Sequence, residues 1–356
     1  MKDLRNFTYE DLAQEVKVLE EKPYRALQIY SWVFRFGVTS IDAMTDISKA
    51  SREKLKELFF IGGDGAVKVI TSSDGTRKFL SGFSDGLSVE SVLIPGEDRL
   101  TLCVSSQAGC ALRCAFCVTG KTGFSRNLTL SELSSQVLSA RAILSPNERV
   151  TNVVLMGMGE PLLNYDNVIK FINILTDSRA FGFSHNKVTL STAGIIPGIK
   201  RLGEDAKINL AVSINATDDK TRGDIMPVNA KYPLKELISA LKDYPLANKR
   251  FITIEYVLLK SVNDGEGRAV ELARLLRGIR CKINLIPFNG WQGARFETPD
   301  ERDVTRFADV LRRAGYETFI RFSKGADVGA ACGQLSGSFG KGFAGAQSAA
   351  FQAETL

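Results

Sequence analysis

The sequence is poor in histidine and has no long apolar run. His185 is the single histidine among 356 residues, so imidazole is scarce both as a metal ligand and as a general base. No stretch approaches the roughly 18 apolar residues of a membrane span, and the first residues, MKDLRNFTYEDL, lack the apolar core of a secretory signal. The sequence therefore predicts a cytoplasmic protein with no membrane partner.

The composition is that of a folded protein. Apolar residues make up 44% and charged residues 24% of the chain, which excludes the disordered and fibrous classes. The length exceeds that at which one hydrophobic core usually stops growing, so we expect a large catalytic domain and a smaller one. The net charge of +6 is compatible with an RNA partner, although enzymes that bind no nucleic acid also carry such charges.

Residues 1–62 are predicted to form a small helical accessory domain. The spacing of one buried helix face is found in Ile29, Trp32, Val33 and Phe36. Aromatic and basic residues interleave in KPYRALQIYSWVFRF. This pattern fits a helical core with a solvated basic face, and it also fits stacking of the aromatic rings on RNA bases.

Residues 63–98 are predicted to form a β-hairpin region that links the helical domain to the rest of the chain. The dipeptides Asp74-Gly75 and Asp85-Gly86 are typical of tight hairpin turns in which both central residues have positive φ.

Strands alternate with amphipathic helices over residues 99–335, which is the pattern of parallel β-α units. The candidate strands are LTLCVSS, VTNVVLMGMGE, NKVTLSTAG, INLAVSIN, RFITIEYVLL, CKINLIPFN and YETFIRFS. Two helix starts carry predicted capping boxes, which are Thr129 with Glu132, and Thr298 with Pro299 and Glu301. Six or seven such units predict an α/β fold with an open or closed barrel.

The predicted strands separate polar from apolar side chains. One face of INLAVSIN carries Asn209, Ser213 and Asn215, and one face of LTLCVSS carries Thr101, Cys103 and Ser105. Polar groups also recur on one side of residues 189–191 and 253–255. An antiparallel sheet with one wet face would alternate similarly, but the intervening helices favour a barrel with a polar interior. Residues 336–356 are rich in Gly, Ser and Ala and are predicted to be a flexible tail.

Six cysteines without a secretory signal favour reduced thiols that serve metal or redox chemistry. Three of them follow a predicted strand directly, in Cys110-Ala-Leu-Arg-Cys114-Ala-Phe-Cys117. Soft thiolates at this spacing can wrap one iron-sulfur cluster and leave one iron without a protein ligand. The alternatives are three unrelated buried thiols, or a zinc site, although zinc favours paired C-x2-C knuckles and here there is one. A zinc site would take its fourth ligand from Cys281, Cys332 or Cys103.

The C-x3-C-x2-C motif after a first barrel strand resembles the radical S-adenosylmethionine (SAM) superfamily. LCVSSQAGCALRCAFC, VVLMGMGEPLLN, VTLSTAG, IEYVLL, CKINLIPFN and DVGAACGQL resemble, in order and spacing, the RlmN/Cfr-type RNA adenine methyltransferases. The resemblance implies a partial (β/α)6 barrel. It also implies a 4Fe-4S cluster on Cys110, Cys114 and Cys117, with an open iron that binds SAM for cleavage to a 5'-deoxyadenosyl radical.

The resemblance implies separate roles for two other cysteines. Carbon 2 of adenine is too weakly nucleophilic for simple methyl displacement, so a radical route is required. Cys332 is implied to be methylated by one SAM and to lose a methyl hydrogen to the radical from a second SAM. Cys103 is implied to help remove the ring proton and then to form a disulfide with Cys332. Cys281 has no implied role, and Glu90 matches a proton acceptor but could instead pair with an arginine on the hairpin surface.

The family also implies a set of SAM contacts. A carboxylate at a strand end suits the SAM ammonium group, and glycine allows close backbone approach. Many family members carry histidine where this sequence has Asn215, which can donate a hydrogen bond but cannot titrate. The implied contacts are Gly159, Glu160, Ser191, Ser213, Ile214, Asn215 and Asn289.

The implied substrates are 23S rRNA and tRNA, methylated at adenine carbon 2 by a monomer that receives electrons from a donor such as flavodoxin. Cfr-like methylation of carbon 8 is the close alternative, and the RlmN side is favoured by Pro161, Leu162, Leu163 and Asn164. A hypothesis from another class is a non-catalytic, metal-containing RNA-binding module.

Overall fold

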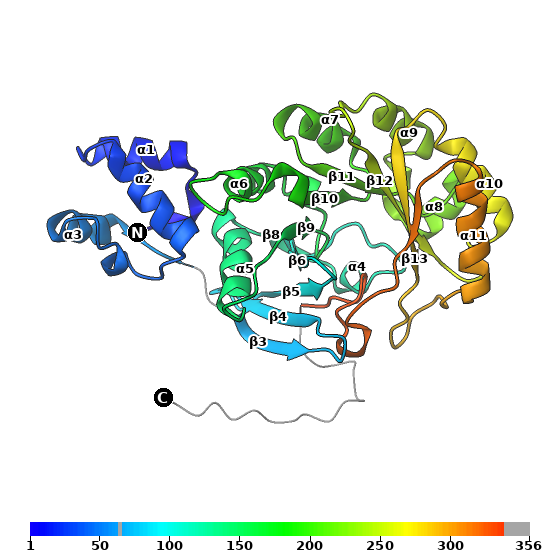
Figure 1. Ribbon diagram of the computed structural model, residues 1–356, viewed down its shortest axis with the longest axis horizontal. Coiled ribbons are helices and arrows are strands. Elements are labelled where there is room, and N and C mark those ends of the chain that lie inside the picture. Colours follow the sequence, from blue (N-terminus) through cyan, green and yellow to red (C-terminus); the bar gives the residue numbers. More distant parts are fainter. Residues whose placement is uncertain (63–65, 338–356) are drawn as a thin grey trace.

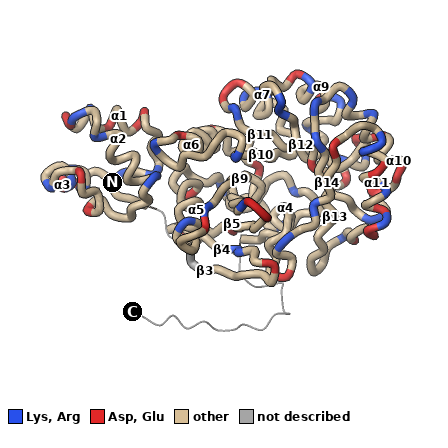
Figure 2. Tube along the Cα trace, in the orientation of Figure 1, with Lys and Arg blue, Asp and Glu red and all other residues tan. Residues whose placement is uncertain are grey.

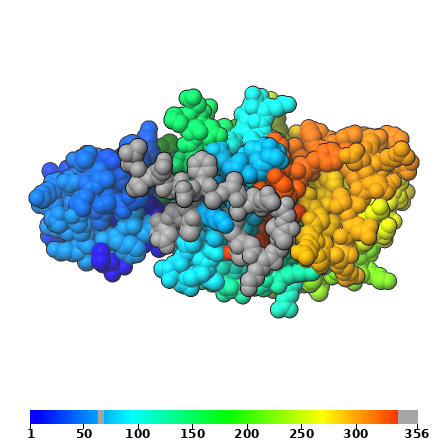
Figure 3. Space-filling model, turned by 90° about the horizontal axis from the view of Figure 1, so that it is seen from below, coloured from blue at the N-terminus to red at the C-terminus, as the bar shows by residue number. Residues whose placement is uncertain are grey.

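The computed structural model describes residues 1–62 and 66–337. A helical module lies at one end of the molecule and a larger α/β body at the other, with a three-stranded extension beneath the body (Figure 1). Figure 3, which shows the molecule from below, has the same arrangement, with the blue N-terminal residues and the orange barrel residues at opposite ends.

The N-terminal module is mainly helical, as predicted. Its elements are β1 (Lys2–Asp3), η1 (Leu4–Asn6), α1 (Tyr9–Val18), α2 (Tyr24–Tyr30), η2 (Ser31–Phe36), η3 (Ile41–Ala43), α3 (Lys49–Leu58) and β2 (Phe59–Phe60). Ile29 and Val33 are buried, but Phe36 is 61% exposed, so its predicted place on the buried face is wrong. The reason is that η2 is π-helical, and its wider turn shifts Phe36 away from the face predicted for 3.6 residues per turn.

A ten-stranded sheet forms the body, in the order β14-β13-β12-β11-β10-β9-β6-β5-β4-β3. Its parallel strands are β6 (Leu100–Cys103), β9 (Asn152–Leu155), β10 (Val188–Thr192), β11 (Asn209–Ser213), β12 (Ile252–Leu258), β13 (Cys281–Pro287) and β14 (Thr318–Ile320). All the strands predicted for the barrel are present. Because β14 and β3 are the two edges, the sheet is an open, partial barrel.

Helices connect the parallel strands. They are α4 (Val118–Thr122), α5 (Leu130–Ala142), α6 (Tyr165–Thr176), α7 (Ile196–Asp205), α8 (Asp219–Ile225), α9 (Leu234–Lys242), α10 (Glu266–Leu275) and α11 (Glu301–Arg313), with 3-10 turns η4 (Pro161–Leu163), η5 (His185–Lys187) and η6 (Pro227–Ala230). The capping box of Thr129 and Glu132 is confirmed at α5. The predicted box at Thr298 is wrong, because Asp300 is the N-cap of α11 and the Thr298 hydroxyl donates to the carbonyl of Phe288.

The three-stranded extension consists of β3 (Ala66–Thr71), β4 (Arg77–Gly82) and β5 (Ser88–Pro95), and β5 pairs antiparallel with β6. Its turns lie where the Asp-Gly dipeptides predicted them. Of the four residues in these two dipeptides, however, only the glycines have positive φ, at 83° for Gly75 and 81° for Gly86. The predicted turn geometry is therefore wrong, since each loop is a longer hairpin loop closed by a left-handed glycine.

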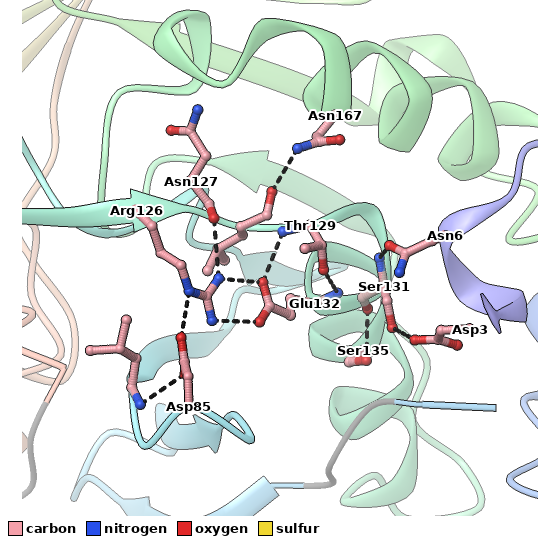
Figure 4. Close-up of polar contacts among 12 residues, drawn as sticks. Asp3, Asn6, Asp85, Arg126, Asn127, Thr129, Ser131, Glu132, Ser135 and Asn167 are labelled. Carbon is pink, nitrogen blue, oxygen red and sulfur yellow. Dashed lines mark hydrogen bonds and ion pairs between the residues drawn. The ribbon is translucent and has the colours of Figure 1, made fainter. Parts of the chain in front are cut away.

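Arg126 ties this extension to the barrel. It lies on β8 (Phe124–Asn127), and its guanidinium lies between Asp85, at 2.6 Å, and Glu132, at 2.7 Å (Figure 4). The N-terminal module reaches the same helix start, because the amide of Ser131 donates to Asn6 at 2.9 Å. The beginning of α5 thus joins all three parts of the molecule.

Charged residues of both signs are interspersed along the outer helices α7, α9, α10 and α11 (Figure 2). Within the described residues, no helix has the length and apolar character needed to cross a membrane.

Candidate active site

The polar interior face predicted from strand alternation is present in the barrel. Ser213, Glu255 and Asn284 are register partners on β11, β12 and β13, so their side chains share one face of the sheet. Asn284 Nδ2 donates to Glu255 Oε1 at 2.9 Å. Burial raises the pKa of Glu255 to about 7. The alternation pattern had placed Glu255 on this face, but no motif indicated a function for it.

The loop with Cys110, Cys114 and Cys117, which we call the cluster loop, lies between β7 (Gln107–Gly109) and α4. The amide of Cys110 donates to the Gly123 carbonyl at 2.8 Å, and that of Cys117 to the Cys114 carbonyl at 3.1 Å. Gly109 has a φ of 77°, and a Cβ there would lie 1.9 Å from the Gly123 oxygen. Only glycine fits at this entry to the loop.

The three thiols of the cluster loop lie close enough to interact electrostatically. Burial raises the pKa of Cys110 to about 11, with a smaller contribution from Cys117. Burial also raises the pKa of Cys114, which Cys117 and Cys110 raise further. Buried thiols of this kind become good ligands when a metal centre compensates their negative charge, so the donor set fits an iron-sulfur cluster. Among the described residues, no three His, Cys, Asp or Glu side chains surround a single metal-ion position.

Glu160 approaches the same space from the segment that follows β9. Burial raises its pKa to about 7, although the amide of Ala193 donates to its carboxylate at 2.7 Å. Gly159 has a φ of 96°, and a Cβ there would lie 2.5 Å from the Cβ of Gln107. The close backbone approach predicted for Gly159 is therefore present, and it brings a carboxylate near the thiols of Cys110 and Cys114.

Arg222 is a site residue that no sequence motif indicated. It is fully buried, and its guanidinium donates to the carbonyls of Ala193, at 2.7 Å, and Ile214, at 3.1 Å. Burial lowers the pKa of Arg222 to about 10, and its positive charge lowers the pKa of Cys114. Arg222 thus joins the ends of β10 and β11 beside the cluster loop.

Cys332 lies near both Cys103 and the cluster loop. Cys332 is an exposed residue by surface area, but protein atoms surround its thiol, and this burial, then Glu255 and Cys117, raises its pKa to about 11. Cys103 is buried at the end of β6, and burial followed by the neighbouring Cys332 raises its pKa. Neither thiol is in a disulfide. The structure therefore brings together two cysteines that are far apart in sequence.

Cys281 lies elsewhere. It is the first residue of β13 and pairs with Ile252 at the start of β12. The cluster loop follows the opposite, carboxyl ends of the parallel strands. Cys281 is therefore not placed to complete a metal site with Cys110, Cys114 and Cys117.

Glu90 is fully buried on β5, so the alternative of a surface pair with arginine is wrong. Its carboxylate lies 3.0 Å from Lys78 Nζ and accepts from the amide of Ser336 at 2.7 Å. The carbonyl of Glu90 accepts from the Ser105 hydroxyl at 2.6 Å. A lysine rather than an arginine is its partner because Lys78 is on the adjacent strand β4.

The remaining residues of the predicted SAM site are at the carboxyl ends of the strands. Ser191 and Ser213 are partly exposed, whereas Ile214 and Asn215 are buried. Asn215 has a φ of 58°, and its side-chain oxygen accepts from the amide of Val257 at 2.7 Å. Asn289 Nδ2 donates to the carbonyl of Cys332 at 3.1 Å. These two amides thus already have protein partners.

Comparisons with known proteins identify the family. The model of the ribosomal RNA large subunit methyltransferase N-terminal domain matches residues 2–61, and the radical SAM superfamily model matches residues 104–273. A dual-specificity RNA methyltransferase RlmN of Desulfosudis oleivorans is 49% identical, over 95% of this chain and 92% of its own. The chain belongs to the RlmN family. The resemblance inferred from the sequence is therefore confirmed.

Other RlmN relatives agree with this assignment. The RlmN of Marinobacter nauticus is also 49% identical, over 90% of this chain and 89% of its own. A crystal structure of a radical SAM methyltransferase from Sphaerobacter thermophilus has a TM-score of 0.90 and 39% identity, and covers 95% of this chain and 100% of that one. The partial barrel fold is thus confirmed. Membership of the radical SAM superfamily implies a 4Fe-4S cluster and SAM.

Proposed function

We propose that this RlmN-family enzyme methylates carbon 2 of an adenine in 23S rRNA and in tRNA. The relatives are named dual-specificity RNA methyltransferases. The observation that carries the proposal is the position of Cys332, whose thiol lies near Cys103 and near Cys117 of the cluster loop. A cysteine that first receives a methyl group from SAM must lie near the cluster loop. If a second cysteine later breaks its bond to the transferred carbon, that cysteine must also lie beside it.

We assign the cofactor contacts as the family pattern implies. Cys110, Cys114 and Cys117 hold the cluster. When bound, the cluster and two SAM molecules per turnover supply a methyl group and a 5'-deoxyadenosyl radical. The SAM contacts come from the carboxyl ends of β9 to β13, and the residues are Gly159, Glu160, Ser191, Ser213, Ile214, Asn215 and Asn289.

Cys332 and Cys103 act in sequence. Cys332 loses its thiol proton and takes the methyl group of one SAM, which leaves as S-adenosylhomocysteine. The S-methyl group then loses one hydrogen atom, and its carbon bonds to carbon 2 of adenine. Cys103 takes the proton from carbon 2, with Glu90 as the candidate final acceptor, and the adduct gives up one electron, for which the bound cluster would be the acceptor. The Cys103 sulfur then bonds to the Cys332 sulfur while the sulfur–carbon bond breaks, and protonation of the released carbon completes the methyl group.

The disulfide left between Cys103 and Cys332 needs two electrons before the next turnover. We propose that a cytoplasmic protein donor such as flavodoxin supplies the electrons for SAM cleavage, and that the enzyme works as a monomer. Methylation of carbon 8 is the rival outcome. The segment Pro161–Leu163, which forms η4 directly after Glu160, supports carbon 2 because it resembles the RlmN side of the family.

The test is anaerobic reconstitution with iron, sulfide and reductant, followed by labelled SAM and 23S rRNA freed of protein. We expect 5'-deoxyadenosine and a label in 2-methyladenosine, with Cys332→Ala as the inactive control. Label in 8-methyladenosine would overturn the choice of carbon. Persistent absence of 5'-deoxyadenosine would favour the non-catalytic RNA-binding module.

A further inference from the structure

Residues 325–337 form a segment of consecutive turns, which we call the Cys332 loop. Glycine recurs in it at every fourth position. A Cβ at Gly325 would lie 2.7 Å from the Cβ of Ala330 and 2.8 Å from Cγ2 of Thr76. Glycine is therefore required where the loop meets the β3–β4 turn. Positive φ angles are found at Gly325, Gly329, Gly333 and Gly337.

The β3–β4 turn holds the beginning of the Cys332 loop. The amide of Gly325 donates to Asp74 Oδ2 at 2.8 Å. In the other direction, Asp327 accepts from the Ser72 hydroxyl at 2.5 Å and from the Ser73 amide at 3.0 Å. The turn and the loop thus each contribute one carboxylate that accepts hydrogen bonds from the other, and such charge-assisted bonds are strong.

Strands β4 and β5 hold the middle and the end of the loop. Lys78 Nζ donates to the Gly329 carbonyl at 3.2 Å, and Glu90 accepts from the Ser336 amide at 2.7 Å. The Ser88 hydroxyl donates to the Gly337 carbonyl at 2.6 Å. In Figure 1 the orange-red end of the described chain accordingly lies beside the end of β3 and the beginning of β4, and in Figure 3 the orange-red residues lie next to the blue residues of the extension.

The barrel holds the other side of the same loop. The amide of Val118, next to Cys117, donates to the Gly333 carbonyl at 2.7 Å, and the Thr119 hydroxyl donates to the Leu335 carbonyl at 2.6 Å. Asn289 also donates to the carbonyl of Cys332. Cys332 is therefore fixed between the extension and the cluster loop.

We propose that the extension β3–β5 is a scaffold that positions Cys332, and that Asp74 and Asp327 are positioning residues for methyl transfer. The inference rests on the proposed function, in which the Cys332 sulfur must meet SAM and then Cys103. Reacting groups held a fraction of an ångström from the correct place lose much of the rate advantage of proximity. Neither carboxylate touches the reacting atoms, so both act through the loop that carries Cys332.

The test compares wild type with the full-length double variant Asp74→Ala, Asp327→Ala. Asp309→Ala is the matched control, because its carboxylate pairs with Arg312 on the exposed surface of α11, away from the Cys332 loop. We expect kcat to fall about tenfold with the KM for RNA unchanged, and the ratio of 5'-deoxyadenosine to methylated adenine to rise roughly threefold, because a loosened Cys332 wastes radicals. Asp327→Asn should recover part of the coupling, since an amide oxygen still accepts one of the two hydrogen bonds.

A second readout needs no cofactor. Hydrogen exchange of the cluster-free proteins should show lost protection in peptides that cover residues 325–337 in the double variant, and none in Asp309→Ala. Unchanged exchange would overturn the scaffold, and increased exchange with unchanged coupling would overturn the positioning role. If wild type itself forms no methylated RNA, the proposed function fails and the positioning role fails with it, whereas the exchange result still reports on the scaffold.

Discussion

The cluster loop and the Cys332 loop both present thiols to the barrel interior, but different contacts hold them. The cluster loop is closed mainly by neighbours in sequence, as in the hydrogen bonds from Cys110 to Gly123 and from Cys117 to Cys114, and the amide of Ala115 adds one distant contact, to the carbonyl of Ile225. The Cys332 loop depends on partners about 250 positions earlier, as in the Lys78 contact to Gly329. A site that is closed mainly by local contacts can be predicted from the sequence pattern. The position of a loop that distant strands hold can be seen only in the folded structure.

Removal of a cluster thiol should have the largest effect. Cys114→Ala takes away one of three ligands, so we expect loss of bound iron and sulfide after reconstitution and no detectable RNA methylation. Cys281→Ala is the control, because that thiol lies at the opposite ends of the strands and should leave the iron content unchanged. Loss of iron in Cys281→Ala would contradict the assignment of the cluster ligands.

Substitution of the cysteine pair should separate chemistry from cluster binding. Both Cys332→Ala and Cys103→Ala should keep their iron. Cys332→Ala should transfer no methyl group, whereas Cys103→Ala should accumulate a covalent protein–RNA adduct, visible by denaturing electrophoresis, because nothing releases the bridging carbon. Normal turnover by Cys103→Ala would show that it is not the resolving residue.

The buried pair of Lys78 and Glu90 tests how the Cys332 loop is anchored. Lys78→Met leaves the Glu90 carboxylate buried without its cation, and we expect the free energy of unfolding of the cluster-free protein to fall by about 3–5 kcal/mol. Urea denaturation measures this change. Lys282→Met, which removes a surface pair with Glu317, should cost far less. Equal losses in the two variants would mean that Lys78 and Glu90 do not anchor the loop.

Titration of Asp74 should give the smallest effect. Hydrogen bonds from Thr76, then that from Gly325, overcome the opposing effect of burial and lower the pKa of Asp74 from 3.8 to about 2. A carboxyl with a depressed folded pKa stabilises the fold fully above its unfolded pKa and loses this contribution as the pH falls toward the folded pKa. Wild type should therefore lose stability relative to Asp74→Asn between about pH 4 and pH 2. If the unfolding temperatures of wild type and Asp74→Asn changed in parallel over this pH range, the ionised Asp74 carboxylate would not stabilise the fold.

The sequence predicted what depends on local pattern. Strand alternation placed Cys103, Ser213 and Glu255 on the interior face, and the cysteine spacing located the cluster loop. The sequence did not predict features that depend on backbone geometry or on contacts between distant residues. Residue periodicity does not encode the π-helical turn that exposes Phe36, the lack of a positive φ at Asp74, or the choice of Asp300 as N-cap.

Long-range partners account for the other differences. Arg222 joins strand ends through backbone carbonyls, and carbonyls leave no signature in a sequence. The partner of Glu90 is a lysine because β4 and β5 pair in one register, with Lys78 opposite Val92 and Glu90 opposite Leu80. Only the family resemblance linked Cys103 with Cys332, and the fold supplies the reason why they can meet.

The central claim is that the transferred carbon passes through Cys332, and isotope tracing tests it most directly. Wild-type enzyme is given SAM with a fully deuterated methyl group, and the methylated adenine and 5'-deoxyadenosine are analysed by mass spectrometry. The account predicts 2-methyladenine that retains two deuterium atoms, with the third in 5'-deoxyadenosine. A methyl group that arrives with all three deuterium atoms would contradict it, because direct transfer from SAM would then suffice.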